Sequence, residues 1–428
     1  MKKFNPLGMA KQSKTFCILP WIHQYVGPPG DVKPCCVYKH KEQLGTMKDH
    51  TLEQIWNNEK TKEMRLRFLN GEQDPFCNIC NAREELGHGI PYKEQFNVKF
   101  FENNKDIQKI VSTTNEDGSL DEHKLLYMDA RFNNLCNLAC RSCGPHFSTS
   151  WVLDHRKLWN KTVKEDINDG FQFAGKKEDQ LYEEIEPHLG NLLEIYFAGG
   201  EPLMQKDHYQ VLAKLIELGN TDLIVRYNTN FSQLKLGSHN AINYWKKFRN
   251  ISIDASLDGS KEKAEYWRHG TKWDTIVKNR IKVMKEAPNV KFNIAFTLSW
   301  PNAFNLLEFH KEWVDMELIG PDDIKINCLD TPYYYSLKNI PDWKKIKIEK
   351  AFRDHIDWVR NTGMGDRFIY LLEVAIKYMW SETDRQQDIN ESLKQCYDMT
   401  KRLDIIRNES FFDVFPEHKD IENIMKNI

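Results

Sequence analysis

Strand-like and helix-like hydrophobic patterns alternate through the middle of the chain. Six short apolar runs of strand length are separated by segments in which apolar residues recur at helical spacing. This alternation is typical of β/α units, whose strands form a parallel sheet. The predicted strands are Leu125–Phe132, Leu192–Phe197, Leu223–Tyr227, Ile251–Leu257, Val290–Leu298 and Ile324–Cys328. We therefore predict an α/β fold built on a partial (β/α)6 TIM-like barrel.

The segments on either side of the predicted barrel have other patterns. Before it, we expect short strands around Cys17 and over Val32–Val37, joined by a turn at Gly27–Gly30, and a helix over Leu52–Leu69. After it, helical spacing predicts three helices at Trp343–Arg360, Phe368–Trp380 and Asp384–Arg407. The predicted divisions are a small cysteine-rich module at 1–100, a polar linker at 101–123, the barrel at 124–330 and a helical C-terminal cap at 331–428.

Composition narrows the class of protein and its partners. Of 428 residues, 40% are hydrophobic and 12% aromatic, which is enough for a sizeable core. The formal charge of −2 favours neither nucleic acid nor an anionic membrane as a partner. No apolar run is long enough to span a bilayer and no apolar signal core follows Met1, so we expect a cytoplasmic protein. Ten cysteines in such a protein indicate metal binding rather than disulfides.

Three cysteines with the spacing C-x3-C-x2-C directly follow the first predicted barrel strand: Cys136, Cys140 and Cys143. Thiolates hold iron-sulfur clusters, and a four-iron cluster with three protein thiolates keeps one iron open to another ligand. Two alternatives remain at this point. A structural zinc site would need a fourth ligand such as His146, and a disulfide would leave one thiol over.

The cysteine spacing resembles that of the radical S-adenosylmethionine (radical SAM) superfamily. The resemblance implies that Cys136, Cys140 and Cys143 are catalytic and hold a 4Fe-4S cluster, whose open iron binds SAM and passes an electron to it. The implied product is a 5'-deoxyadenosyl radical. The sequence departs from the family at Ser142, where an aromatic residue or a methionine usually contacts the adenine, so that contact is not carried over.

A second group of cysteines lies in the first hundred residues. Cys77 and Cys80 form a C-x2-C knuckle, and Cys17 with one of Cys35 or Cys36 would complete a four-sulfur shell. Spacing alone leaves structural zinc and an auxiliary iron-sulfur cluster open. Pro-Trp after the first cysteine, then Leu-x-x-Ile-Trp-Asn, an arginine and the knuckle, resemble the SPASM/twitch module of many radical SAM enzymes. The resemblance implies a second, auxiliary iron-sulfur cluster on Cys17, Cys35, Cys77 and Cys80, in a module that here precedes the barrel.

Polar residues after the later predicted strands extend the resemblance. Gly199-Gly200-Glu201-Pro202 follows the second strand and matches the motif that holds the amino group of SAM in that family. Glycines let the backbone approach a ligand closely. The resemblance implies further SAM contacts at Asn228, Thr229, Asn230, Ser256, Asp258, Arg268 and Thr297. The alternative is that the polar residues after the strands are ordinary turn residues and that Arg268 forms a surface ion pair.

The resemblance implies a radical SAM oxidoreductase that abstracts hydrogen from its substrate, with the auxiliary cluster as electron acceptor. A peptide or protein side chain is the expected substrate. The alternative is that the protein is a radical SAM dehydrogenase that oxidises a small alcohol or sugar. The expected partner is an external one-electron reductant such as flavodoxin or ferredoxin, with no membrane or nucleic-acid partner. Two rivals from other classes are a zinc-stabilised interaction protein and a pure electron carrier. The Gly-Gly-Glu-Pro motif speaks against both, because neither needs a pocket for an ammonium group. Residues Lys394–Glu417 are also similar to twitch-type radical SAM proteins, some of them phage-encoded.

Overall fold

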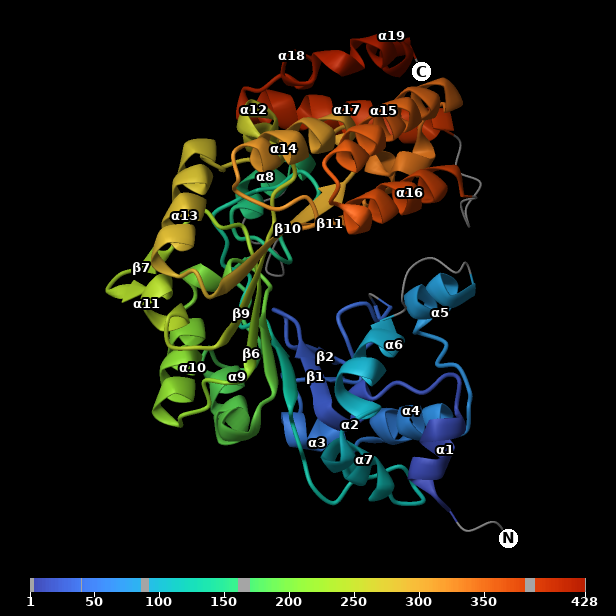
Figure 1. The fold of residues 1–428 in the computed structure, drawn as a ribbon, viewed down its shortest axis with the longest axis vertical. Coiled ribbons are helices and arrows are strands. Elements are labelled where there is room, and N and C mark those ends of the chain that lie inside the picture. The colour runs from blue at the N-terminus through green and yellow to red at the C-terminus, as the bar shows by residue number, and fades with distance from the viewer. Residues whose placement is uncertain (1–3, 40, 86–91, 161–169, 382–388, 428) are drawn as a thin grey trace. The chain divides into compact units, whose positions relative to one another are not determined.

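The computed structural model describes residues 4–39, 41–85, 92–160, 170–381 and 389–427. The chain divides into two compact units, each assembled from separate stretches of sequence (Figure 1). Unit 1 comprises Met1–Asn134, Gln172–Arg226 and Lys247–Asn250. Unit 2 comprises Leu135–Phe171, Tyr227–Lys246 and Ile251–Ile428.

Unit 1 contains a run of five strands in the order β5-β4-β1-β2-β3. β1 (His23–Val26) lies parallel to β4 (Tyr127–Ala130), which lies parallel to β5 (Glu194–Phe197). β2 (Asp31–Lys33) and β3 (Gly45–Thr46) continue the sheet in antiparallel pairing. The cysteine-rich segment and the first predicted barrel strand therefore share one sheet.

The turn predicted at Gly27–Gly30 joins β1 and β2, and Gly30 has the positive φ of 93° that favours glycine. The strand predicted around Cys17 is wrong. Leu19–Ile22 form helix α2 instead, with Pro20 in the first turn, where its fixed φ favours helix initiation. The strand predicted at Val32–Val37 ends early, at Lys33, because Pro34 has no N–H to donate to the sheet.

The predicted helix Leu52–Leu69 is two helices rather than one. α3 (Leu52–Trp56) begins at a capping box formed by Thr51 and Gln54. α4 (Glu59–Leu69) begins at Asn58, whose side chain accepts a hydrogen bond from the amide of Thr61. This second cap divides the run of helical spacing. The other helices of unit 1 are α1 (Pro6–Gln12), α5 (Asn78–Glu85), α6 (Tyr92–Phe96), α7 (Lys105–Ser112), α9 (Gln180–Ile185) and α10 (Lys206–Glu217).

Unit 2 contains three parallel strands in the order β11-β10-β9. β10 (Val290–Leu298) and β11 (Ile324–Cys328) have the predicted bounds, and β9 covers Asn250–Ala255. β6 (Ile224–Thr229) passes from unit 1 into unit 2 between Arg226 and Tyr227. All six predicted barrel strands are thus confirmed, and the ends of β4, β5, β6 and β9 are shifted by one or two residues.

Aromatic side chains pack the helices of unit 2 onto its strands. Trp313 of α14 (Ala303–Asp315) lies 5.0 Å from Phe309 and 5.6 Å from Trp273 of α13 (Trp273–Glu286), measured between ring centroids. These rings cover Phe292 on β10 and exclude water from this side of the sheet. The remaining elements before the tail are α8 (Trp151–Trp159), β7 (Lys235–Leu236), β8 (His239–Asn240), α11 (Ala241–Trp245) and α12 (Lys261–Trp267).

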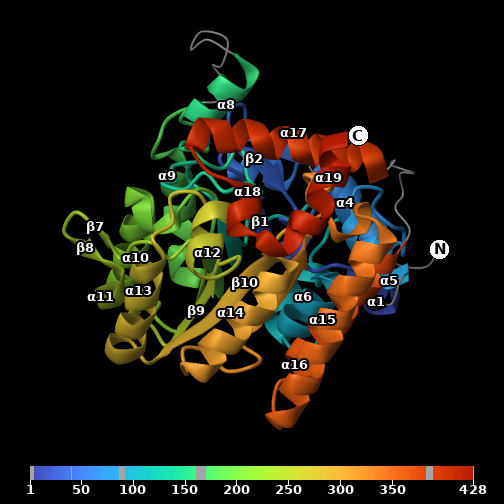
Figure 2. The same cartoon turned by 90° about the horizontal axis from the view of Figure 1, so that it is seen from above.

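The tail after residue 331 is helical, as predicted. Its helices are α15 (Asp342–Asn361), α16 (Asp366–Trp380), α17 (Ile389–Arg407), α18 (Phe411–Val414) and α19 (Lys419–Asn427). The predicted start of the third tail helix, at Asp384, lies outside the described residues. Figure 2 shows α17 running beside α8, and the two helices are in contact.

Short turns of 3-10 or π helix complete the chain. They are η1 (Asn97–Phe101), η2 (Glu186–Asn191), η3 (Pro202–Met204), η4 (Tyr333–Tyr335), η5 (Leu337–Asn339) and η6 (Pro416–His418). The predicted fold class is confirmed: an α/β chain with a large, mostly parallel sheet and a helical C-terminal region. Within the described ranges, no helix is both long enough and apolar enough to cross a membrane.

Candidate metal centres

The three cysteines of the C-x3-C-x2-C motif lie in residues 135–150, here called the cysteine loop, which form neither helix nor strand. Its buried backbone groups therefore need hydrogen-bond partners outside regular structure. Three side chains at the end of the loop and the start of α8 donate to loop carbonyls. The pairs are Ser148 Oγ with Leu138 O (2.5 Å), Ser150 Oγ with Cys136 O (2.8 Å) and Trp151 Nε1 with Cys140 O (2.7 Å).

The segment after α12 holds the other side of the cysteine loop. The amide of Ala139 donates to the carbonyl of His269, and the amide of Arg141 donates to the carbonyl of Trp267, both at 2.9 Å. Gly270 has a φ of +99°, and a Cβ atom there would lie 2.9 Å from the carbonyl oxygen of Asn137. Only glycine allows this approach of the two backbones.

Two polar side chains contact the sulfurs of the cysteine loop. Asn230 Nδ2 lies 3.8 Å from Cys136 Sγ, and Arg268 Nη1 lies 3.7 Å from Cys140 Sγ. Burial, with the neighbouring Cys140, raises the pKa of Cys143 to about 12. A metal would have to displace this proton, because only the thiolate is a ligand. Donors to the sulfurs tune the reduction potential of a cluster.

Three of the predicted SAM contacts form one group beside Cys140. Arg268 Nε lies 2.8 Å from Asp258 Oδ2, and the amide of Thr297 donates to Asp258 Oδ1 at 2.7 Å. Burial raises the pKa of Asp258, and the charge of Arg268 opposes this effect. The arginine therefore bridges a buried carboxylate and a cysteine sulfur. A role for this group in binding SAM stays a prediction.

The other predicted contacts of unit 2 lie at the ends of β6 and β9. Thr229 Oγ1 accepts a hydrogen bond from the amide of Phe231 at 3.0 Å. The carbonyl of Thr229 accepts one from the amide of Ser256 at 2.7 Å. Asn228 and Ser256 are half-buried, and Asn230 is buried. The structure thus brings these turn residues together in one unit with the cysteine loop.

The Gly-Gly-Glu-Pro motif lies in unit 1. Gly199 has a φ of +108°, and a Cβ atom there would lie 2.9 Å from Arg131 Cβ, so this position requires glycine. The amide of Gly200 donates to the carbonyl of Asn133 at 3.2 Å. Glu201 is buried, and its Oε1 accepts a hydrogen bond from the amide of Leu203 at 3.1 Å. The carboxylate therefore orients the turn that carries it.

The four cysteines predicted as auxiliary ligands, Cys17, Cys35, Cys77 and Cys80, line one pocket of unit 1. The pocket has about 460 Å³ of empty space, part of it open to solvent. Burial raises the pKa of Cys35, and the neighbouring thiols add to the effect. Cysteine binds a metal as the thiolate, so a metal in this pocket would have to displace these protons.

Cys36, the alternative to Cys35, is not among the residues that line this pocket. The charged groups that act on its thiol belong to Asp129, Arg131 and Arg226 instead. Its neighbour Cys35 lines the pocket together with Cys17, Cys77 and Cys80. The geometry therefore favours Cys35 as the fourth ligand.

The Trp-Asn and arginine positions of the module have a structural role. Arg65 is fully buried and donates to Pro20 O at 2.9 Å, Asn57 Oδ1 at 3.0 Å and Gly118 O at 3.2 Å. Its guanidinium lies 5.0 Å from the ring of Trp56. Arg65 thus ties α2 to α4 beside the cysteine pocket.

Sequence reasoning missed several residues that hold the cysteine loop. Arg407 of α17 donates to the carbonyl of Ala139, and Arg141 pairs with Asp404 and Glu409. Arg141 lies between two predicted ligands, which is the one signal in the sequence that could have drawn attention to it. The tail acids and Arg407 carry no such signal.

A match to a protein-family model agrees with the predicted cysteine-rich module. Residues 17–81 match the model of the SPASM family, described as an iron-sulfur cluster-binding domain. This stretch contains all four pocket cysteines, and the predicted SPASM-type iron-sulfur module is confirmed for it. The comparison with curated proteins found no significant match.

Solved structures with a similar course of the chain include proteins bound to S-adenosylmethionine (AdoMet). One is anSMEcpe with bound AdoMet, at 19% identity and a TM-score of 0.39 over 55% of this chain and 61% of that chain. Another is Streptococcus suis SuiB bound to S-adenosylmethionine, at 13% identity and a TM-score of 0.36 over 71% of this chain and 64% of that chain. SuiB bound to the precursor peptide SuiA matches at 14% identity and a TM-score of 0.34, over 67% of this chain and 62% of that chain.

The matched part makes up 61% of the first of these proteins. At these identities and TM-scores, the likeness assigns no role to any residue of this chain.

The pocket geometry predicts different effects for two adjacent cysteines. After anaerobic reconstitution, Cys35→Ser should hold about four fewer iron atoms per chain than the native protein, because a 4Fe-4S cluster loses a ligand. Cys36→Ser is the matched control and should keep the native iron content. Iron and acid-labile sulfide analysis measures both. Equal iron in the two variants would contradict the assignment of Cys35.

Proposed function

We propose that this chain is a radical SAM enzyme with one auxiliary iron-sulfur cluster. The observation that carries the proposal is the cysteine loop, in which an irregular backbone presents Cys136, Cys140 and Cys143 while serine, tryptophan and arginine side chains bind its carbonyls. Asn230 and Arg268 approach two of the sulfurs. An ordinary surface loop needs neither feature.

The residues of the cysteine loop fit a cluster better than a single zinc ion. A structural zinc site needs four ligands at about 2.0–2.3 Å from one point. His146, the residue that would complete such a shell, is exposed. Among the residues that the structure describes, no three histidine, cysteine or carboxylate side chains group so as to hold one ion. Three thiolates suit a 4Fe-4S cluster with one open iron, and the four cysteines of the pocket in unit 1 suit a closed cluster.

When bound, a three-cysteine cluster with SAM supplies radical chemistry, in which SAM is cleaved and a hydrogen atom is taken from the substrate. The protein supplies position and polarity. Asn230 and Arg268 donate toward sulfur, which stabilises the more negative, reduced form of a cluster. Gly270 allows the close backbone packing that fixes the loop.

We assign the auxiliary cluster to Cys17, Cys35, Cys77 and Cys80, and we propose that it accepts the electron left on the substrate. Four thiolates would leave no open iron for a substrate ligand, so electron transfer is the role that remains. The net reaction would then be an oxidation or a crosslink. A variant with Cys77 and Cys80 replaced by alanine that folds and turns over normally would refute this role.

For the substrate we propose a peptide or protein side chain, the class that the resemblance to radical SAM enzymes with a SPASM-type module implies. The near balance of charges over the whole chain gives no support to a nucleic-acid substrate. A small alcohol or sugar is the alternative. Incubation with candidate peptides and sugars, followed by mass spectrometry for loss of hydrogen, distinguishes the two.

The assignment predicts that the reconstituted, reduced native protein converts SAM to 5'-deoxyadenosine. Cys140→Ala should form none above background, because the loop loses a cluster ligand, and Cys328→Ala, at a cysteine outside both groups, should behave as native. Liquid chromatography of the anaerobic reaction measures the product. No product from the native protein, with zinc as the only bound metal, would favour a zinc-stabilised interaction protein.

A further inference from the structure

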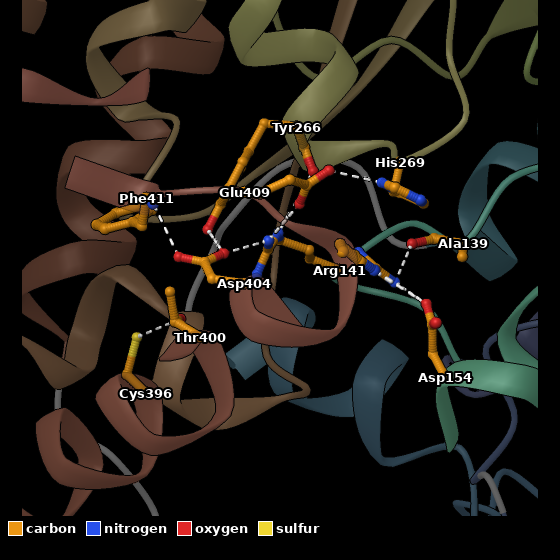
Figure 3. A network of polar contacts seen from close by, with 11 residues as sticks. Ala139, Arg141, Asp154, Tyr266, His269, Cys396, Thr400, Asp404, Glu409 and Phe411 are labelled. Atoms are coloured by element: carbon orange, nitrogen blue, oxygen red, sulfur yellow. Dashed lines mark hydrogen bonds and ion pairs between the residues drawn. The ribbon is translucent and has the colours of Figure 1, made fainter. Parts of the chain in front are cut away.

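Two arginines link the cysteine loop to the C-terminal tail, one from the loop and one from the tail. Arg141 reaches from the loop to Asp404 and Glu409 of the tail (Figure 3). Arg407 reaches from the tail to the carbonyl of Ala139 in the loop. We propose that α17 and residues 408–411 position the cysteine loop for its cluster, with Arg407, Asp404 and Glu409 as positioning residues. This inference rests on the proposed function.

The side chain of Arg407 is 1% exposed and binds the loop at the residue before Cys140. Its Nη2 donates to the carbonyl of Ala139 at 2.8 Å, and its Nε donates to Asp154 Oδ2 at 2.9 Å. The carbonyl of Cys140 itself is bound by Trp151, whose ring lies 5.1 Å from the Arg407 guanidinium. Two successive carbonyls of the loop are therefore fixed from α8 and α17.

Arg141 lies between Cys140 and Cys143, and its side chain is fully buried. Its Nη2 lies 2.6 Å from both Asp404 Oδ1 and Glu409 Oε2. A buried cation is tolerated only when it is paired and hydrogen-bonded. The loop therefore adopts this conformation only with the two tail carboxylates in place.

The same two carboxylates also hold the segment that pairs with the loop backbone. Glu409 Oε1 binds His269 Nδ1 at 2.6 Å, and Asp404 Oδ1 accepts a hydrogen bond from the hydroxyl of Tyr266 at 2.7 Å. Burial acts to raise the pKa of Glu409, but the hydrogen bond from His269 and the charge of Arg141 lower it below its ordinary value. The tail thus contacts the cysteine loop directly, and also through the backbone partner of Ala139.

Apolar contacts reinforce the polar ones. Leu403 of α17 packs in one buried cluster with Ala139, Trp151 and Leu158, and Cys143 packs against this cluster. One face of α17 therefore covers the loop. Arg407 of this helix binds the loop backbone, and Asp404 of the helix and Glu409 beyond its end bind Arg141. A tail that only closed the fold would not need its charged groups at the residues flanking Cys140.

The test compares cluster retention in α17 variants of the full-length, reconstituted protein. Arg407→Ala should lose iron from the SAM-responsive cluster to a chelator about 10-fold to 100-fold faster than the native protein, as expected when a residue that orients metal ligands is removed. Arg407→Lys should restore part of the native rate. Arg402→Ala, an exposed arginine of the same helix, is the matched control and should behave as native. Electron paramagnetic resonance (EPR) amplitude of the reduced cluster, followed during chelation, gives the rate.

A second variant, Glu409→Gln, is a milder change than Arg407→Ala, because the amide has nearly the same shape and can still hydrogen-bond. Glu409→Gln, like Arg407→Ala, should lose iron to the chelator faster than the native protein, while the EPR signal of the auxiliary cluster stays unchanged. Native chelation rates in both Arg407→Ala and Glu409→Gln would overturn the positioning role. A native protein that forms no SAM-responsive cluster would instead refute the proposed function.

Discussion

The candidate centre depends on one constraint, which is that an irregular backbone carrying three thiols must have its buried polar groups satisfied by side chains. Residues 135–150 form no helix or strand and so lack regular backbone hydrogen bonds. Each buried carbonyl left without a partner would therefore destabilise the fold by the free energy of its desolvation. The carbonyls of Cys136, Leu138, Ala139 and Cys140 all accept from side chains outside the motif. The conformation of the thiols is therefore a property of the surrounding fold.

The partners of the loop come from segments far apart in sequence. Some lie at the end of the loop and the start of α8, at 148–151, whereas the others lie at 267–270 and 404–411. Arg141 and Glu409 are 268 positions apart, yet their charged groups lie 2.6 Å from one another. The helical tail contains none of the cysteines of the loop or of the pocket. It nevertheless contributes to the site, because its side chains hold the cysteine loop. In unit 1 the equivalent role falls to Arg65, a buried cation that binds carbonyls of neighbouring segments beside the cysteine pocket.

The sequence predicted those features that local pattern determines. β10 and β11 have the predicted bounds, and the four pocket cysteines line one pocket, as the resemblance to the SPASM/twitch module implied. The strand predicted around Cys17 was wrong because Pro20 favours the first turn of a helix, and Leu52–Leu69 was read as one helix because a cap at Asn58 is a weak signal inside an amphipathic run. The arginine and carboxylate contacts of the loop could not be predicted, because ion pairs between distant residues leave no periodic pattern in the sequence.

The central claim is that the cysteine loop holds a cluster with one iron open to SAM, while the pocket of unit 1 holds a cluster that is closed. EPR spectra of the reduced protein, recorded before and after addition of SAM, test this claim most directly. The account predicts that the signal of one cluster changes its g values on addition of SAM and that the signal of the other does not. Two signals that are both unaffected by SAM would contradict it.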